Sequence, residues 1–346
     1  MKPSLVRALI EREFEAAVSG TDHTPVLLWG PPGVGKSAIV ASVAHAHQVP
    51  LVDIRLAQME PTDLRGIPFR EGDGVTWAVP RMLPDAVRHG PRGILFLDEL
   101  TSAVPTVTAA AYQLILDRRL GEYRVPAGWA IVAAGNRHGD RGVTYQMPAP
   151  LANRFAHYDV DADLDDWVQW ADEMHIDPRI VAFLRFRPDL LFAFDAARTA
   201  AAFPSPRTWV FAARALAKFS DHPELLAEAL AGCVGASAAL ALRAFMQHIA
   251  ALPDPAVVLA DDSIAIPEPV ELQYALATSL ARHIARLVGP AQSLAIDRAL
   301  SIARRFKARE IGTMLVTDLA RVSRAPLVGR PAFAQWATEV GELLAR

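Results

Sequence analysis

The chain has 346 residues, a formal net charge of −3 and 52% hydrophobic residues. This length allows two or three domains with large cores, and the mildly acidic balance argues against a globally basic, nucleic-acid-binding surface. The single cysteine, Cys233, excludes an intramolecular disulfide and favours a reducing, cytoplasmic location. The uncharged stretch at 229–242 is too short to span a bilayer, so we expect no membrane span.

The first elements in chain order are a helix, a strand and a second helix. Apolar residues spaced three to four apart between Leu5 and Val18 predict an amphipathic helix. The apolar run at 25–29 predicts a buried strand, and residues 38–44 predict the second helix. Between them lies a glycine-rich turn, in the order that a phosphate-binding loop requires. Its residues are Gly30, Pro31, Pro32, Gly33, Val34, Gly35, Lys36 and Ser37.

This turn has the residue types that bind a nucleoside triphosphate. Glycines let the backbone curl so that its N–H groups point at a phosphate chain, and the helix N-terminus adds partial positive charge. We expect Lys36 to reach the β- and γ-phosphates and the Ser37 hydroxyl to ligate Mg²⁺. Because the chain lacks an Asn-Lys-x-Asp sequence of the guanine-specific kind, ATP is preferred over GTP.

The rest of the first half predicts a sheet covered by helices. Apolar runs on both faces of a strand are typical of central strands in a parallel α/β sheet. A helix is expected at 104–116, and 80–90 is expected to be a short helix or a loop. Further strands are expected at 50–56, 94–97, 129–136 and 155–160, and loop-and-hairpin insertions at 63–77 and 118–128.

Polar residues follow two of these strands. Adjacent carboxylates, Asp98 and Glu99, end the strand at 94–97, where open α/β sheets bind ligands. We expect Asp98 to hold Mg²⁺ and Glu99 to polarise the attacking water as a general base. Asn136 ends the next strand, where its amide can bridge the γ-phosphate and that water. A simple turn residue at 136 is an equally good interpretation of the sequence alone.

Two arginines outside these strand ends are further candidates. Arg154 precedes the last predicted strand, and its forked donors match developing phosphate charge, although a solvated flank is the usual role of a charge there. Arg207 opens a predicted helix, where a cation opposes the helix dipole and a phosphate would compensate it.

From residue 161 onward the strand pattern stops and helices are expected. Arg185 and Arg187 form a basic cluster that we interpret as a solvated helix face. The expected helices cover 165–174, 180–186, 208–219, 224–252, 271–287, 291–306 and 332–344.

In combination, these motifs resemble the AAA+ ATPases of the MoxR and dynein-related group, over roughly residues 5–220. The resemblance implies that Lys36 and Ser37 are Walker A, Asp98 and Glu99 Walker B, and Asn136 sensor 1. Arg154 would be the arginine finger supplied to a neighbouring subunit, and Arg207 sensor 2 on a helical lid. The sequences that carry it are Gly-Pro-Pro-Gly-Val-Gly-Lys-Ser, Ile-Leu-Phe-Leu-Asp-Glu, Ala-Ala-Gly-Asn, Leu-Ala-Asn-Arg-Phe and Ser-Pro-Arg-Thr.

The resemblance also implies an architecture and partners. The fold class is α/β: a five-stranded parallel P-loop sheet with insert hairpins, followed by an all-helical lid and a C-terminal helical region. The expected domains are 1–160, which binds nucleotide, 161–252, the lid, and 253–346, a C-terminal extension. Family members form hexameric rings with ATP between subunits, and MoxR-type proteins often act with a partner that carries a von Willebrand A domain.

The predicted function is therefore Mg²⁺-dependent ATP hydrolysis by a ring that remodels a protein partner. A DNA-directed motor is an alternative that the net negative charge argues against. A nucleotide-gated assembly scaffold is another alternative, and the intact Glu99 argues against it.

Overall fold

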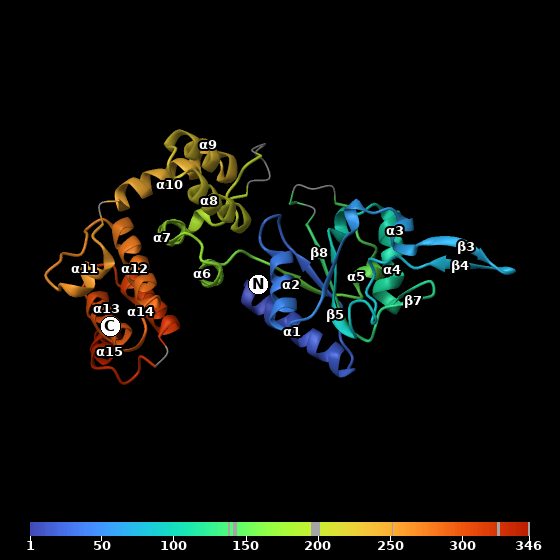
Figure 1. Cartoon of the computed structure of the whole chain (residues 1–346), viewed down its shortest axis with the longest axis horizontal. Coiled ribbons are helices and arrows are strands. Elements are labelled where there is room, and N and C mark those ends of the chain that lie inside the picture. Colours follow the sequence, from blue (N-terminus) through green and yellow to red (C-terminus); the bar gives the residue numbers. More distant parts are fainter. Residues whose placement is uncertain (138, 141–143, 195–200, 251, 324–325, 345–346) are drawn as a thin grey trace. The chain divides into compact units, whose positions relative to one another are not determined.

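The computed structural model describes the chain except for residues 138, 141–143, 195–200, 251, 324–325 and 345–346 (Figure 1). The chain divides into two compact units. The first comprises Met1–Trp167 and Phe194, and the second comprises Val168–Ala193 and the described residues after 200. No helix in the described part of the chain is long and apolar enough to cross a membrane.

The first unit is built on a five-stranded sheet in the order β2-β5-β8-β1-β9. Every neighbouring pair in this sheet is parallel, which confirms the predicted fold class. Central strands of such a sheet are covered on both faces, which explains why β5 and β8 are buried almost throughout. The strands are β1 (Val26–Trp29), β2 (Leu51–Arg55), β5 (Arg92–Asp98), β8 (Gly128–Gly135) and β9 (Ala156–Asp159).

Successive residues of the strands point into opposite hydrophobic cores, as the two-residue period of a strand requires. Leu28 packs with buried residues of α1 (Pro3–Ser19) and α2 (Lys36–Ala46). Its neighbour Leu27 packs in a second core that contains the buried face of α4 (Pro105–Asp117). Helices therefore cover both faces of the sheet. The carboxyl ends of the strands lie along one of its edges, and the amino ends lie along the opposite edge.

Both predicted hairpins are present in the first unit. Strands β3 (Ile67–Glu71) and β4 (Gly74–Ala78) pair antiparallel and project away from the sheet (Figure 1). Strands β6 (Arg119–Leu120) and β7 (Tyr123–Arg124) form the second pair. One expectation was wrong: the loop expected before the first hairpin contains a short helix, α3 (Pro61–Arg65), which begins at a capping box.

The second unit is helical in its described part. Its first elements are the rest of α6 (Leu164–Glu173), which begins in the first unit, then α7 (Pro178–Phe186) and α8 (Pro206–Phe219). The single helix expected at 224–252 is instead two helices, because Gly235 has φ 84° and ψ 153° and ends the hydrogen-bonding pattern. The remaining helices are α9 (Pro223–Val234), α10 (Ala236–Ile249), α11 (Pro255–Ala260), α12 (Val270–Ala285), α13 (Gly289–Ala303), α14 (Arg309–Val322) and α15 (Pro331–Leu344).

Two of these helices, α11 and α14, were not expected from the sequence. Helix α14 buries Leu315 and Leu319 in a core that also contains Val258 of α11 and Leu280 of α12. This core lies within the segment predicted as the C-terminal extension. The boundaries predicted near residues 160 and 252 remain predictions.

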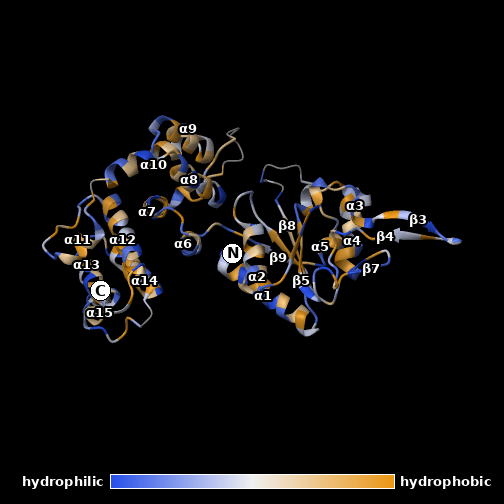
Figure 2. Cartoon of the chain, viewed as in Figure 1, coloured by the Kyte–Doolittle hydropathy of each residue, from blue (hydrophilic) through white to orange (hydrophobic). Residues whose placement is uncertain are grey.

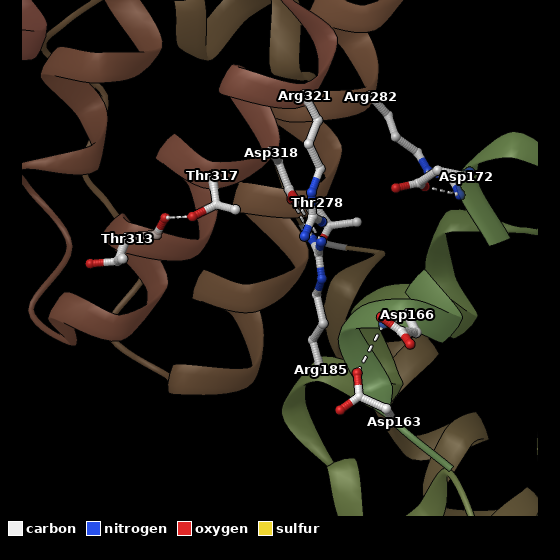
Figure 3. Close-up of polar contacts among 10 residues, drawn as sticks. All are labelled: Asp163, Asp166, Asp172, Arg185, Thr278, Arg282, Thr313, Thr317, Asp318 and Arg321. Atoms are coloured by element: carbon white, nitrogen blue, oxygen red, sulfur yellow. Dashed lines mark hydrogen bonds and ion pairs between the residues drawn. The ribbon is translucent and has the colours of Figure 1, made fainter. Parts of the chain in front are cut away.

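The expectation that Arg185 is solvated was wrong. Its side chain is only 7% exposed, and it forms an ion pair with Asp318 of α14, whose side chain is 8% exposed (Figure 3). A buried arginine needs such a partner because an unpaired charge in a protein interior is costly. The pair joins α7 to α14 within the second unit, so the basic residue has a structural role.

Candidate functional site

The carboxyl ends of β1, β5 and β8 meet at one edge of the sheet, because the three strands are parallel neighbours. The glycine-rich loop follows β1, Asp98 and Glu99 lie at the end of β5, and Asn136 follows β8. The fold therefore brings the residues predicted to bind phosphate and metal to a single edge. Their catalytic roles remain predictions.

The loop itself has the backbone shape of a phosphate cradle. Gly35, at the N-cap of α2, has φ 110°, which residues with a side chain rarely adopt. A Cβ on Gly30 would lie 2.8 Å from the carbonyl oxygen of Val160, so a larger residue does not fit there. Val34 is buried in the core beside α2 and anchors the loop. The loop is thus held curled at the N-terminus of α2, where backbone N–H groups favour an anion.

Lys36 connects this loop to the neighbouring strand end. Its Nζ donates hydrogen bonds to Oδ1 of Asn136 at 3.0 Å and to the carbonyl oxygen of Pro31 at 3.2 Å. The ammonium group therefore lies between the loop and the candidate sensor, the position expected of a lysine that contacts the terminal phosphates.

The donor set beside Lys36 also fits Mg²⁺. Ser37 Oγ donates a hydrogen bond to Oδ2 of Asp98 over 2.8 Å. Two adjacent ligands of an octahedral Mg²⁺ ion, each about 2.05 Å from the metal, lie about 2.9 Å from each other. The spacing of the Ser37 hydroxyl and the Asp98 carboxylate already matches that requirement. Partial burial, and then the charge of Asp98, raise the pKa of Asp53 on the adjacent strand β2.

Glu99 is held in an unusual backbone conformation. Its φ of 58° and ψ of 33° place it in the left-handed region, which is uncommon for a residue with a side chain. Its N–H donates to Oδ1 of Asp98 at 2.8 Å, and its carbonyl accepts from the N–H of Ser102 at 2.9 Å. Such strain persists where the surroundings enforce it, which is common at functional sites.

Sequence reasoning missed Thr101, which contacts Asn136 from the turn after Glu99. The Asn136 N–H donates to Thr101 Oγ1 at 3.0 Å, and Thr101 Oγ1 donates to the Asn136 carbonyl at 3.2 Å. Gly135 is needed for this approach, because a Cβ there would lie 2.8 Å from Thr101 Cγ2. No local pattern predicts the contact, since 35 residues separate the two partners.

The two candidate arginines are not part of this cluster. Arg154 is exposed and comes just before β9, at the edge opposite the carboxyl ends of the parallel strands. The four residues of β9 span roughly 13 Å, so the backbone of Arg154 lies far from the loop of its own sheet. Arg207 is exposed in the first turn of α8, in the second unit, after a capping box formed by Ser205 and Thr208.

Comparison with known proteins agrees with the geometry. Residues 25–155 match the family model of the AAA domain of the dynein-related subfamily. Midasin of Giardia intestinalis is 32% identical over 145 residues, 40% of this chain and 3% of midasin. The denitrification regulatory protein NirQ of Pseudomonas aeruginosa is 38% identical over 96 residues, 28% of this chain and 36% of NirQ. NorQ of Paracoccus denitrificans is 31% identical over 156 residues, 43% of this chain and 56% of NorQ.

The chain thus spans less than two thirds of the length of each of these relatives. The matched segment, residues 25–155, contains the glycine-rich loop, both carboxylates, Asn136 and Arg154. The predicted resemblance is confirmed for this segment: residues 25–155 are similar to the AAA domain of the dynein-related subfamily.

Proposed function

We propose that this protein is a Mg²⁺-dependent ATP hydrolase that works as a homo-oligomeric ring, expected to be hexameric, and remodels a protein partner. A protein with a von Willebrand A domain is our first candidate for that partner. The observation that carries the proposal is the contact of Ser37 with Asp98 beside the contact of Lys36 with Asn136. Together these contacts bring an ammonium group, a hydroxyl beside a carboxylate, and a polar amide together at the end of the glycine-rich loop.

Each residue of this edge has a role in the proposed reaction. Ser37 and Asp98 would hold Mg²⁺, which neutralises charge on the phosphates when bound. Lys36 stabilises the terminal phosphates, Glu99 accepts the proton of the attacking water, and Asn136 orients that water. The left-handed backbone conformation of Glu99 and the hydrogen bond from its N–H to Asp98 set the direction in which the Glu99 side chain leaves the backbone.

Arg154 is proposed to act on the nucleotide of a neighbouring copy. Within one chain it lies at the opposite edge of the sheet from Lys36, so it cannot complete its own site without a large rearrangement. An exposed guanidinium at that edge is available to a second copy stacked against it. Its planar donors suit the charge that develops on transferred phosphate. We propose Arg207, on α8, as a further phosphate contact.

The exposed hairpin supports a protein rather than a nucleic acid as the partner. The strands β3 and β4 carry large exposed apolar residues, with Ile67 67% exposed, Val75 65% and Phe69 48%. Figure 2 shows hydrophobic and hydrophilic residues alternating along this hairpin. Exposed apolar clusters mark protein-contact sites more often than phosphate-contact sites, which are rich in Lys and Arg.

Steady-state phosphate release from variants tests the proposal. We expect Glu99→Gln to bind ATP with turnover reduced by at least about 100-fold. Arg154→Ala is expected to lose turnover to a similar degree with nucleotide affinity retained, and Lys36→Ala serves as the control that loses binding.

Mixing the Glu99→Gln and Arg154→Ala proteins should restore part of the activity, because each copy supplies the group that the other lacks. Full turnover by Arg154→Ala alone would exclude the role between copies. Phosphate release that requires DNA and falls steeply with salt would instead favour a nucleic-acid motor.

A further inference from the structure

Beyond the predicted catalytic residues, one buried threonine connects the edge of the sheet to the segment that precedes Arg154. Thr101 is 5% exposed and lies two residues after Glu99, in the short 3₁₀ turn Leu100–Ser102. Its side chain makes the two hydrogen bonds to the backbone of Asn136 described above. Its own carbonyl accepts a hydrogen bond from the N–H of Tyr145 at 2.7 Å.

The contact with Tyr145 leads along the chain to Arg154. Residues 145–148 run into the short helix α5 (Ala149–Ala152), whose Leu151 is fully buried. The Arg154 N–H then donates to the carbonyl of Leu151 at 3.0 Å. A single residue therefore contacts both the backbone of Asn136 and the segment that ends at the exposed arginine.

Room exists for this segment to change position. A cavity of about 330 Å³ lies between α4 and residues 145–148, and its lining includes Thr101, Tyr145 and Met147. The Tyr145 end of the segment borders this cavity, and its backbone is hydrogen-bonded to Thr101 there.

We propose that Thr101 is a positioning residue that sets the place of Asn136 and links it to the segment leading to Arg154. This inference rests on the proposed function, because it assigns Thr101 to the same hydrolysis reaction. Through this link, a displacement of Asn136 by nucleotide in one copy would reach the arginine offered to the next copy. Thr101 itself touches no substrate in this scheme.

Thr101→Val tests the position of Asn136 directly, because valine has nearly the same shape and lacks the hydroxyl. We expect the backbone N–H of Asn136 to exchange its hydrogen with solvent about tenfold faster in this variant, because the hydroxyl that accepts its hydrogen bond is gone. Thr101→Ser should keep the protection.

A matched control is Thr108→Val. Thr108 is also buried and lines the same cavity, but its hydroxyl has only long contacts, of 3.4 and 3.5 Å, to carbonyls of its own helix region. Unchanged exchange at Asn136 in Thr101→Val, relative to Thr108→Val, would overturn the inference whether or not the protein hydrolyses ATP.

Kinetics test the consequence for the reaction. Thr101→Val should lower kcat by about tenfold with little change in KM or in ADP affinity, while Thr101→Ser restores kcat and Thr108→Val stays at the wild-type value. Equal kcat for Thr101→Val and Thr108→Val would refute the positioning role. If the wild-type protein itself releases no phosphate, the proposed function fails, and the exchange measurement still decides whether Thr101 holds Asn136.

The link to Arg154 is measured by mixing copies. Arg154→Ala protein is mixed either with Glu99→Gln protein or with the Glu99→Gln, Thr101→Val double variant. In both mixtures the Arg154→Ala copy hydrolyses ATP, and the added protein supplies only the arginine. We expect about threefold smaller recovery with the double variant. Equal recovery with both supplements would show that the hydroxyl of Thr101, and so its hold on Asn136, does not act on the segment leading to Arg154.

Discussion

At the scale of single residues, Arg118 shows how one side chain can determine the charge of another. It ends α4 with φ 53°, and its guanidinium donates to the carbonyl of Pro126 at 3.0 Å and also to that of Trp129. A further guanidinium nitrogen lies against Nε2 of His23. Because a guanidinium only donates, this ring nitrogen must accept, which requires neutral His23. Partial burial, and then the charge of Arg118, lower the pKa of His23.

This pair predicts a pH dependence of stability. Because the pKa of His23 is lower in the folded state than its ordinary value of about 6.5, the unfolded chain binds more protons as the pH falls. The stabilising effect is complete above about pH 6.5 and is lost as the pH falls through the lowered folded-state pKa.

His23→Gln, which keeps an acceptor without titrating, should lose less stability between pH 7.5 and 5.5 than the wild type. We expect a difference of no more than about 1 kcal/mol, because His23 is only partly buried. Thermal or urea unfolding at the two pH values measures it. Parallel losses in both proteins would contradict the assignment to His23.

At the scale of elements, the second unit depends on a charge pair between α7 and α14. Arg185 contacts both carboxylate oxygens of Asp318, at 2.8 and 2.6 Å, and donates to Oγ1 of Thr278 on α12 at 3.1 Å (Figure 3). Arg321 lies 3.5 Å from the same carboxylate on its exposed side. Three helices therefore converge on one paired charge.

Removing Asp318 alone should be much worse than removing both partners. Asp318→Leu leaves the Arg185 charge buried with only Thr278, and we expect the free energy of unfolding to fall by about 3–5 kcal/mol. Arg185→Met should cost less, because Arg321 still faces Asp318. The double variant Arg185→Met, Asp318→Leu should recover most of the loss.

Chemical denaturation of the full chain measures these differences. Asp172→Leu is the matched control, since Asp172 pairs with Arg282 at 2.8 Å in a more exposed position and should contribute less than about 1 kcal/mol. A double variant as unstable as Asp318→Leu would contradict the account.

At the scale of the whole molecule, the groups needed for the proposed reaction lie on opposite edges of one sheet. Lys36, Asp98, Glu99 and Asn136 gather at the carboxyl ends of the strands, whereas Arg154 precedes β9 at the other edge. A second copy is therefore the simplest source of the missing arginine, and nucleotide between the copies would join them.

Assembly should accordingly depend on nucleotide and metal. We expect the Glu99→Gln protein to form a larger species with ATP and Mg²⁺. This species should dissociate when EDTA removes the metal, because nucleotide binding is weaker without the Mg²⁺ that Ser37 and Asp98 are proposed to hold. Light scattering after size-exclusion chromatography measures the mass, and Lys36→Ala should stay small under the same conditions. A Glu99→Gln protein of unchanged mass in saturating ATP and Mg²⁺ would argue against the ring.

Much of the sheet and of its candidate site could be predicted from the sequence, for a physical reason. A buried strand is recognised in the sequence as a run of apolar residues. In a parallel sheet all strands end at the same edge, so the residues that follow them lie at that edge. The sequence alone therefore predicts that Lys36, Asp98 and Asn136 lie near each other. For the same reason Arg154, which comes before β9 rather than after it, lies on the other edge.

Contacts between residues far apart in the sequence were decided only by tertiary structure. The bond from Thr101 to Asn136 crosses between two strands, and Arg185 became buried because α14 supplies Asp318. Neither contact could be predicted from a periodic pattern in the sequence. A polar residue that is hydrogen-bonded to a residue far along the chain looks the same in the sequence as a polar residue that faces water. Local patterns report which face of an element is apolar, whereas the pairing of polar groups depends on which elements the fold brings together.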